Sequence, residues 1–364
     1  MKILQIVPRL PPAIDGLGYY ALNLARQLRQ DFGVETHFLV GNPDWTGATE
    51  TEGFPVIPLK QCSAQTFLSQ LPRKVRTILL HYVGYGYAKR GCPLWLVDGL
   101  RRWQSEHLQA RLVTMFHEVY ASGKFWTSAF WLSPLQRNLA ARLARLSDAC
   151  LTSKQRYADI LSQLSQGKHP QIPTLPVFSN IGEPQQPPPL AERTRRIVVF
   201  GHKNSRSQVY QQCLPVLEQV CKMLEIREIY DIGVPTGLKL SPVNGVPIEE
   251  KGVTEAAVIS EILLDSVGSF SNFPLPNNLA KSGVFAAYCC HRLIPIMTLS
   301  SAAPVDGLEA GKHYWAADFR TRQLCLEAGQ IIADNAHAWY QTHNLSIQAK
   351  VFATIFGQSD QSKC

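Results

Sequence analysis

Short runs of hydrophobic residues alternate along the chain with longer segments in which apolar side chains recur every three or four positions. The first run, residues 2–7 (KILQIV), is followed by a Gly/Pro-rich loop and then by residues 18–30, where Tyr20, Leu24 and Leu28 have helical spacing. Short, continuous apolar runs are typical of strands buried on both faces, and the periodic segments are typical of amphipathic helices. The alternation therefore predicts an α/β protein with parallel sheets.

The same pattern places the individual elements. We expect strands at residues 2–7, 35–40, 56–59, 77–82, 111–116, 149–152, 196–200, 228–233, 267–270 and 293–297. We expect helices at residues 18–30, 94–110, 134–146, 154–164, 210–224, 255–265, 282–290 and 336–356. The run GHKNSRS at 201–207 predicts a polar loop. Ligands of such sheets bind beyond the carboxyl ends of the strands.

A proline-rich segment divides the pattern into two halves. Residues 180–196 contain four prolines and three arginines and lack a core pattern, which is typical of a semi-rigid linker. We expect a first domain at 1–183, a linker at 184–196, a second domain at 197–335 and a C-terminal helix at 336–364 that packs back toward the first domain. A chain of 364 residues exceeds the size of one core. We therefore expect two Rossmann-like domains that face each other across a ligand-binding cleft.

Composition and charge narrow the class of protein. Hydrophobic residues make up 45% of the chain and charged residues 18%, which supports packed cores and excludes a disordered chain. The net charge of +8 and the pI near 9.0 indicate an anionic partner, such as nucleotide phosphates, acidic lipid or nucleic acid. The sequence contains neither a zinc-finger spacing nor an RNA-recognition signature, so no nucleic-acid partner is expected.

Cysteine positions and the N-terminus bear on the compartment. None of the nine cysteines forms a CxxC pair, which indicates reduced thiols in a reducing environment. The N-terminal apolar run is too short for a signal peptide, and no stretch reaches the roughly 18 apolar residues of a spanning helix. We expect a cytoplasmic protein, with peripheral contact at the inner face of the membrane as an open alternative.

The loop after the first strand is the most informative segment. Gly16 and Gly18 allow close backbone approach at a helix N-terminus, which presents N–H groups to an anion or a sugar hydroxyl. The dinucleotide fingerprint GxGxxG is incomplete, because Ala21 occupies its third position. A purely structural Gly-rich turn is the alternative to a binding loop.

Seven segments, in a fixed order along the chain, carry a resemblance to a known family. The segments are PRLPPAIDGLGYYALNLA at 8–25, His117-Glu118 after a strand, LTSKQRYADIL at 151–161, VFSNIG at 177–182, VVFGHKNSRS at 198–207, VISEILLDSVGSF at 258–270 and SGVFAAYCCHRLIPIM at 282–297. In this order they resemble GT-B glycosyltransferases, and most closely glycosyltransferase family 4. The resemblance spans nearly the whole chain. Each segment alone is loosely similar, and their order carries the comparison.

The resemblance implies a function. It implies transfer of a sugar, with retention of configuration, from a UDP- or GDP-sugar bound mainly by the second domain to a saccharide or lipid-linked acceptor on the first domain. It implies no metal and no other cofactor, and the sequence has neither an Asp-x-Asp after a strand nor a cluster with metal-ligand spacing. The alternatives are a non-catalytic binding protein of the same fold, a dinucleotide-dependent oxidoreductase and a nucleotide-sugar epimerase.

One departure from the family concerns the donor site. The family carries two glutamates, separated by seven residues, that face the donor sugar and hold the ribose; here their positions are Ala280 and Tyr288. The start of the adjacent helix is retained and could bind a pyrophosphate through backbone amides and one ammonium. The residues expected at this part of the donor site are Asn278, Lys281, Ser282, Gly283 and Tyr288. The alternative for Lys281 is a solvated helix cap.

The remaining candidates follow two strands. His117 and Glu118 come directly after the strand at 111–116, where an imidazole could bind sugar hydroxyls or the donor phosphate. Gly201, Lys203 and Arg206 follow the strand at 196–200, where cations could neutralise the leaving diphosphate. We predict catalytic roles for His117, Glu118, Arg206 and Lys281 and donor contacts at Gly16, Gly18, Gly201 and Lys203. A core histidine and ordinary loop charges are the alternatives.

Two aromatic segments are candidates for acceptor binding. Residues 81–95 (HYVGYGYAKRGCPLW) hold three tyrosines that could stack on sugar rings, or they form a surface turn packed by its own aromatics. Residues 123–131 (GKFWTSAFW) predict a mobile loop. This loop could be an acceptor lid or a shallow membrane contact with a lipid-linked acceptor.

Overall fold

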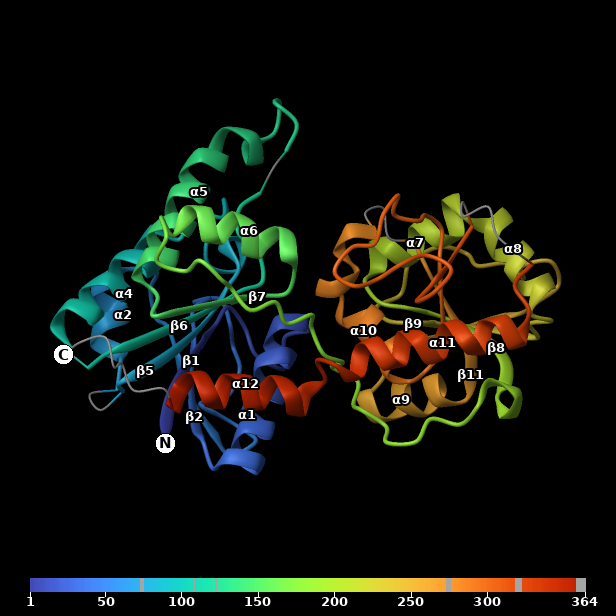
Figure 1. The fold of residues 1–364 in the computed structure, drawn as a ribbon, viewed down its shortest axis with the longest axis horizontal. Coiled ribbons are helices and arrows are strands. Elements are labelled where there is room, and N and C mark those ends of the chain that lie inside the picture. The colour runs from blue at the N-terminus through green and yellow to red at the C-terminus, as the bar shows by residue number, and fades with distance from the viewer. Residues whose placement is uncertain (73–74, 108, 122, 273–275, 318–322, 358–364) are drawn as a thin grey trace. The chain divides into compact units, whose positions relative to one another are not determined.

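The chain folds into two compact units. The computed structural model describes residues 1–72, 75–107, 109–121, 123–272, 276–317 and 323–357. Unit 1 comprises Met1–Pro176 and the segment from Leu345 onward, and unit 2 comprises Val177–Asn344 (Figure 1). Each unit is built on its own parallel sheet, and the predicted cleft between them stays a prediction.

Unit 1 contains a seven-stranded sheet within its described residues, in the order β3-β4-β2-β1-β5-β6-β7. All neighbouring strands are parallel except the short β3, which pairs antiparallel with β4. The strands are β1 (Lys2–Val7), β2 (Glu35–Val40), β3 (Glu50–Thr51), β4 (Phe54–Pro58), β5 (Thr77–Tyr82), β6 (Arg111–Phe116) and β7 (Ala149–Thr152). Five of the predicted ranges, for β1, β2, β5, β6 and β7, agree with the structure at both ends.

Helices cover both faces of this sheet. They are α1 (Gly16–Phe32), α2 (Ala64–Gln70), α3 (Gly84–Tyr87), α4 (Leu94–Glu106), α5 (Ser128–Leu146), α6 (Gln155–Leu164) and α12 (Leu345–Gly357). In β2, Phe38 and Val40 lie in a core with residues of α1, whereas Leu39 lies in the core formed with α4, α5 and α6. Successive side chains are therefore buried on opposite faces, which explains the continuous apolar runs.

Unit 2 contains a six-stranded parallel sheet, again counted over the described residues, in the order β10-β9-β8-β11-β12-β13. Its strands are β8 (Thr194–Phe200), β9 (Glu228–Ile232), β10 (Ile248–Gly252), β11 (Ser266–Ser271), β12 (Ile294–Met297) and β13 (Trp315–Ala316). Its helices are η1 (Leu190–Glu192), α7 (Lys203–Gln212), α8 (Leu214–Met223), α9 (Ala256–Leu264), η2 (Pro276–Lys281), α10 (Gly283–Cys290) and α11 (Leu326–Gln341).

Two predictions near the start of unit 2, one of a loop and one of a helix, were wrong. The predicted polar loop at 201–207 is mostly helix, because α7 begins at Lys203 directly after its N-cap residue His202. The predicted helix at 210–224 is two helices, α7 and α8, separated at Cys213. Pro215 follows at the second position of α8, and a proline is accepted in the first turn of a helix but not in its interior.

The C-terminal segment also differs from its predicted single helix at 336–356. It forms α11 in unit 2 and α12 in unit 1, with residues 342–344 between them. On α12, the Gln348 side chain accepts a hydrogen bond from the Tyr20 hydroxyl of α1 at 2.8 Å and donates one to the Pro176 carbonyl at 2.6 Å. The end of the chain therefore returns to the first unit, as the fold class predicted.

The proline-rich segment predicted as a linker packs into unit 2. Leu190 is part of the unit 2 core, and its N–H donates to the Gln330 side chain on α11 at 2.7 Å. The buried Arg193 guanidinium donates to the carbonyls of Pro188, Ser266 and His291. Residues 194–196 belong to the central strand β8. The segment after the prolines is therefore ordered. Its buried Arg193 is held by hydrogen bonds to carbonyl groups instead of by apolar packing.

Candidate functional site: two polar clusters at the reversals of strand order

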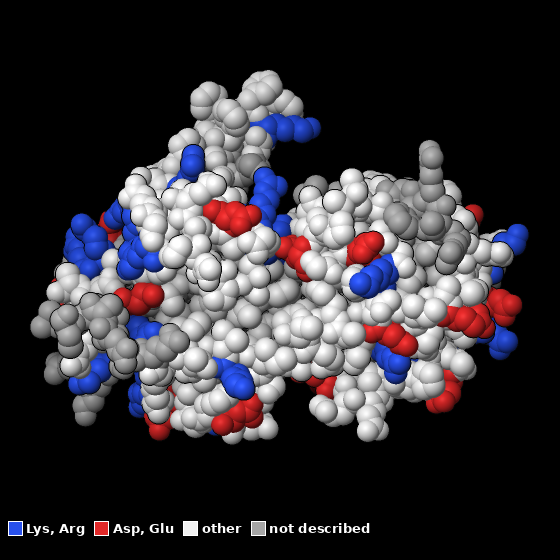
Figure 2. Space-filling view, in the orientation of Figure 1, with Lys and Arg blue, Asp and Glu red and all other residues white. Residues whose placement is uncertain are grey.

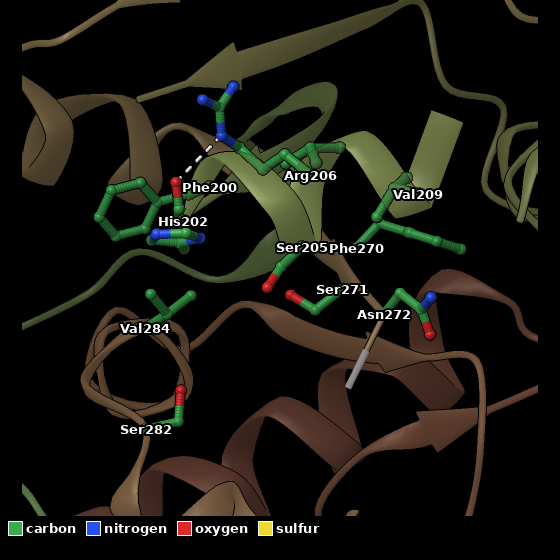
Figure 3. Close-up of a pocket in the computed structure, with 12 residues that line it drawn as sticks. Phe200, His202, Ser205, Arg206, Val209, Phe270, Ser271, Asn272, Ser282 and Val284 are labelled. Carbon is green, nitrogen blue, oxygen red and sulfur yellow. Dashed lines mark hydrogen bonds between the residues drawn. The ribbon is translucent and has the colours of Figure 1, made fainter. Parts of the chain in front are cut away.

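Unit 2 contains a pocket at the carboxyl ends of β8 and β11 (Figure 3). Its cavity volume is about 200 Å³. Chain order runs from β8 outward through β9 and β10 on one side and through β11, β12 and β13 on the other, so strand order reverses between β8 and β11. Open α/β sheets bind ligands at such a reversal. The pocket therefore lies where the topology of the unit 2 sheet favours a ligand.

The wall of the pocket combines small polar side chains with apolar ones. Ser205 of α7 and Ser271 of β11 point their hydroxyls toward one another across the pocket in Figure 3, and Asn272 lies beside them. Val284 and Phe200 supply apolar surface on the opposite side. This combination of hydroxyls, an amide and apolar surface suits an uncharged polar group, such as a base or a sugar.

Two helix N-termini adjoin the pocket. His202, the N-cap of α7, accepts a hydrogen bond from the Asn204 N–H through its Nδ1 atom at 3.3 Å. Ser282, the N-cap of α10, accepts one from the Phe285 N–H at 3.1 Å. Both capping residues line the pocket. The first turn of a helix carries N–H groups without intrahelical partners and a positive dipole, so an anion at the pocket mouth would be stabilised.

Gly201 turns the chain from β8 into α7. Its φ is +129°, a conformation that side chains rarely adopt, and a Cβ there would meet the Val284 side chain at 3.2 Å. The turn is short enough that α7 begins two residues after Gly201, at Lys203. Lys203 is exposed, whereas Gly201 is half-buried and forms part of the pocket wall.

Arg206 holds the loops that surround the pocket. Its side chain is only 1% exposed, although it borders the pocket. The Nε atom donates to the Gly201 carbonyl at 3.0 Å, one terminal nitrogen pairs with Asp231, and the other donates to the Val234 carbonyl. The Tyr210 hydroxyl also donates to Asp231, at 2.9 Å. These contacts position the loops after β8 and β9, and they engage every guanidinium nitrogen within unit 2.

Tyr288 and Ala280 occupy the positions of the family's two glutamates. Tyr288 is fully buried, and burial raises the pKa of its hydroxyl to about 12. That hydroxyl donates to the Phe200 carbonyl at 3.1 Å and accepts a hydrogen bond from the Ser271 hydroxyl at 3.4 Å. Tyr288 therefore ties the ends of β8 and β11 together beneath the pocket. Ala280 is buried, and its carbonyl accepts a hydrogen bond from the Val177 N–H at 2.8 Å.

The other donor-site candidates lie along the same segment. Asn278 is half-buried in η2, and Lys281 ends that short helix. Gly283 is the first residue of α10, and a Cβ there would make ordinary contact with the Asn180 side chain at 3.6 Å. Of this group only Ser282 lines the pocket.

In unit 1, strand order reverses between β1 and β5, and a second polar cluster lies there. His117 follows β6, and its Nε2 atom lies 3.1 Å from Nδ1 of His81, at the end of β5. The two rings stack with centroids 5.4 Å apart, and the Tyr20 ring packs edge-on against both. His81 Nε2 lies 2.9 Å from Oε1 of Gln5 on β1. Three neighbouring strands thus build one chain of polar contacts.

The Gln5 amide sets the protonation pattern of the histidine pair. In the assigned orientation Gln5 Oε1 accepts, so His81 carries its proton on Nε2 and its Nδ1 accepts a hydrogen bond from His117 Nε2–H. Burial holds the pKa of His81 well below its ordinary value, and the neighbouring His117 lowers this pKa further. His81 is therefore neutral, and it fixes the ring orientation of His117.

The glycine-containing loop before α1 makes its contacts within unit 1. A Cβ at Gly18 would lie 2.6 Å from the Arg9 carbonyl oxygen, so only glycine allows this packing. A Cβ at Gly16 would meet nothing within 4 Å. Asp15, the N-cap of α1, accepts a hydrogen bond from the Leu17 N–H at 3.4 Å, and burial raises the pKa of this carboxyl.

The structure groups the sequence candidates by unit. Gly201, Arg206 and Ser282 line the unit 2 pocket, and the buried Tyr288 ties the strand ends beside it. In unit 1, His117 joins a cluster with Gln5, Tyr20 and His81, residues that sequence reasoning did not select. The sequence places His81 and His117 at the ends of consecutive predicted strands. This indicates a cluster only if those two strands, β5 and β6, are known to pair.

Metal and membrane-spanning features are absent from the part of the chain that the structure describes. Within those residues, no group of three or more histidine, cysteine, aspartate or glutamate side chains could hold a metal ion. None of the described helices has the length and hydropathy needed to cross a membrane.

Comparison with known proteins gives matches at the level of structure alone. No sequence family model and no curated protein matches the chain. Among solved structures, TarM aligns with a TM-score of 0.64 at 10% identity, over 98% of this chain and 99% of that chain. An alpha-glucosyltransferase (AGT) in complex with UDP aligns with a TM-score of 0.60 at 10% identity, also over 98% and 99%. WaaG, a glycosyltransferase involved in lipopolysaccharide biosynthesis, aligns with a TM-score of 0.55 at 11% identity, over 98% and 100%.

The chain has the GT-B fold. The alignments extend over both units and both parallel sheets, so the predicted fold class is confirmed. At identities of 10–11% these likenesses concern the arrangement of the elements, and the chemistry must be argued from the residues of this chain.

Proposed function

We propose that the protein is a glycosyltransferase that uses a nucleotide-diphosphate sugar. The observation that carries the proposal is the unit 2 pocket, which lies at the reversal of strand order and is bordered by the N-termini of α7 and α10. Hydroxyls and an amide suit the base and sugar, and helix N-termini suit a diphosphate. The GT-B fold supports this interpretation, and UDP is present in the AGT structure to which the chain is similar. A uridine or guanosine diphosphate sugar is therefore the proposed donor.

The proposed roles follow from exposure and contacts. Lys203, exposed in the first turn of α7, would approach the diphosphate, while Arg206 holds the surrounding loops. Lys281 and Asn278 would contact the donor from η2. His117 and Glu118 in unit 1 would contact the acceptor or the transferred sugar. Charge on the leaving diphosphate would be stabilised by the helix N-termini and by lysine ammonium groups.

The finer features of the reaction are part of the same proposal. As in glycosyltransferase family 4, which the sequence resembles, transfer would proceed with retention of configuration and without a metal ion. NMR of the product would give its anomeric configuration, and EDTA should leave the initial rate unchanged. A product of inverted configuration, or loss of the rate in EDTA that a divalent ion restores, would remove this part of the proposal.

A matched pair of variants on α7 tests the donor site. Ser205 lines the pocket, whereas the Ser207 hydroxyl is exposed and donates to the Lys203 carbonyl at 2.9 Å. Ser205→Tyr would fill the pocket and should weaken UDP binding by about tenfold or more, which corresponds to about 1.4 kcal/mol. Ser207→Tyr adds the same ring outside the pocket and should change affinity by less than about twofold. Calorimetric titration with UDP, GDP, ADP and NAD measures both effects. Equal affinity of the two variants would sink the pocket assignment.

A non-catalytic binding protein of the same fold is the second candidate, and Tyr288 and Ala280 favour it, since neither can supply the carboxylates found in the family. Hydrolysis of the donor without acceptor separates the two functions. We expect slow hydrolysis that Lys281→Ala reduces. Tight donor binding without turnover, in the presence of any acceptor lipid or saccharide, would support the binding protein instead.

A further inference from the structure

Among the residues that the structure describes, the largest group of exposed aromatic side chains lies at the start of α5 in unit 1. Phe125, Trp126, Phe130 and Trp131 are 67%, 65%, 44% and 70% exposed, and Leu135 is exposed beside them. We call these five residues the aromatic tip. Figure 1 shows that this part of α5 and the segment before it project beyond the strands of unit 1. Isolated exposed apolar residues are ordinary, but five within eleven positions form a patch that indicates a binding surface.

The aromatic tip does not contribute to the core of unit 1. The first buried residue of α5 is Gln136, in its third turn, and the apolar packing begins with Leu139 and Ala140. The aromatic side chains at the start of α5 therefore pack on one another in pairs, Phe125 with Trp126 and Phe130 with Trp131, and not into the core of unit 1. An exposed apolar patch outside the core is typical of a binding surface.

The chemistry of the aromatic tip suits the boundary between lipid and water. Tryptophan combines a large apolar ring with one N–H donor, and it is enriched where an apolar phase meets a polar one. The Lys124 ammonium lies 5.1 Å from the centre of the Trp126 ring. An ammonium beside exposed aromatics can contact lipid headgroups while the rings enter the acyl boundary.

The charged residues around the aromatic tip indicate which kind of surface it is complementary to. No aspartate or glutamate occurs between Val119 and Ser147, a stretch that contains Lys124, Arg137 and two further arginines. In Figure 2 the projecting part of unit 1 shows blue side chains but no red ones. A cationic and aromatic surface of this kind is complementary to an anionic membrane.

The two units also differ in their total charge. Unit 1 contains 22 lysines and arginines against 12 aspartates and glutamates, a net charge of +10, whereas unit 2 contains 14 against 16, a net charge of −2. The excess positive charge of the chain therefore lies outside the unit that would bind the nucleotide. Such a surface is electrostatically complementary to an anionic partner of unit 1.

We propose that the aromatic tip docks unit 1 on a membrane that contains anionic lipid. A nucleic acid would also match the charge, but within the tip itself apolar side chains outnumber cations, and an apolar phase accommodates them better than a phosphate backbone. This proposal extends the proposed function. Only one of its consequences, that the acceptor is lipid-linked, rests on the proposed function. Docking itself requires neither donor binding nor turnover.

The test measures vesicle binding of the full-length protein. Sedimentation with phosphatidylcholine vesicles, with and without 30% phosphatidylglycerol, at low and high salt separates the apolar and ionic contributions. We expect binding to the anionic vesicles that weakens at high salt. Trp126→Ser combined with Trp131→Ser should reduce the partition coefficient by about tenfold or more. Ile331→Ser combined with Val253→Ser, which removes two exposed apolar side chains from unit 2, should leave it unchanged.

Two controls keep the outcome clear. Because both tryptophans are exposed, the tip variant should keep the wild-type melting temperature and UDP affinity, so loss of vesicle binding alone would support docking. Equal vesicle binding by wild type and tip variant would overturn the proposal. So would binding of a single-stranded oligonucleotide, abolished by the same variant, in the absence of vesicle binding. Failure of UDP to bind would contradict the proposed function and leave the docking result standing.

Discussion

In unit 2 the strand order reverses between β8 and β11, and in unit 1 it reverses between β1 and β5, yet the two reversals carry different chemistry. The unit 2 reversal opens into a pocket bordered by hydroxyls and helix N-termini. The unit 1 reversal carries a cluster formed by Tyr20, Gln5 and the His81–His117 pair. The same topology therefore carries a pocket in unit 2 and a chain of polar contacts in unit 1, and the side chains account for the difference.

The two units also differ in the contacts that hold the loops after these strands. In unit 2 a buried ion pair, Arg206 with Asp231, connects the loops after β8 and β9. In unit 1 the corresponding loop after β1 is held by backbone packing of Gly18 against Arg9 and by the Trp45 indole, which donates to the Leu10 carbonyl at 2.7 Å. Substitutions at these positions test the comparison directly.

The largest effect is expected from Arg206→Met. This change leaves the Asp231 carboxylate buried without its cation, and breaking a buried ion pair in this way costs about 3–5 kcal/mol. Urea denaturation should show this loss in the free energy of unfolding. Adding Asp231→Leu should recover part of it, because the isolated charge is then gone. Arg137→Met on the exposed surface of α5 should stay within about 0.5 kcal/mol of wild type. A loss below about 1 kcal/mol for Arg206→Met would show that the pair does not hold the loops.

A smaller effect is expected from Gly18→Ala in unit 1. The added methyl group would lie 2.6 Å from the Arg9 carbonyl oxygen, and overpacking of this kind costs about 1–3 kcal/mol. Gly16→Ala, two residues earlier, meets no neighbouring atom and is the matched control; it should be neutral within about 0.5 kcal/mol. Thermal unfolding monitored by circular dichroism measures both. Equal melting temperatures for the two variants would contradict the packing described for this loop.

The smallest effect, on catalysis rather than stability, is expected from His81→Phe. Phenylalanine cannot accept the hydrogen bond from His117, so we expect kcat to fall roughly tenfold while the affinity for UDP, whose proposed site is in unit 2, stays unchanged. His81→Gln retains a polar partner and should keep more activity. His107→Phe, at a partly exposed histidine outside the cluster, is the control. Parallel loss of UDP affinity in His81→Phe would mean that the change acts through the fold.

The sequence predicted the buried strands well, because both faces of each sheet are covered. KILQIV, ETHFLV, TILLHY and RLVTMF are continuous apolar runs for this reason, and their ends agree with the structure. The polar edge strand β10 (IEEKG) lacks such a run and was missed. The start of α7 was missed because its buried face includes Arg206, a charged residue that a hydrophobic pattern assigns to the surface.

The candidate site was less predictable, because it depends on contacts between distant segments. Gly201 and Ser282 were selected from the turns that precede helices, and both line the pocket. Arg206 was selected as a cation for the donor, but the structure engages its guanidinium with Asp231, a partner 25 residues away. The pairing of His81 with His117 follows from the adjacency of β5 and β6, which the sequence does not state.

The most direct test is a crystal structure of the protein soaked with UDP or a UDP-sugar. We expect ligand density at the ends of β8 and β11, in contact with Gly201, Ser205 and Ser271, with the diphosphate at the N-terminus of α7 or α10. Density for the nucleotide at the His81–His117 cluster of unit 1, with the unit 2 pocket empty, would contradict it.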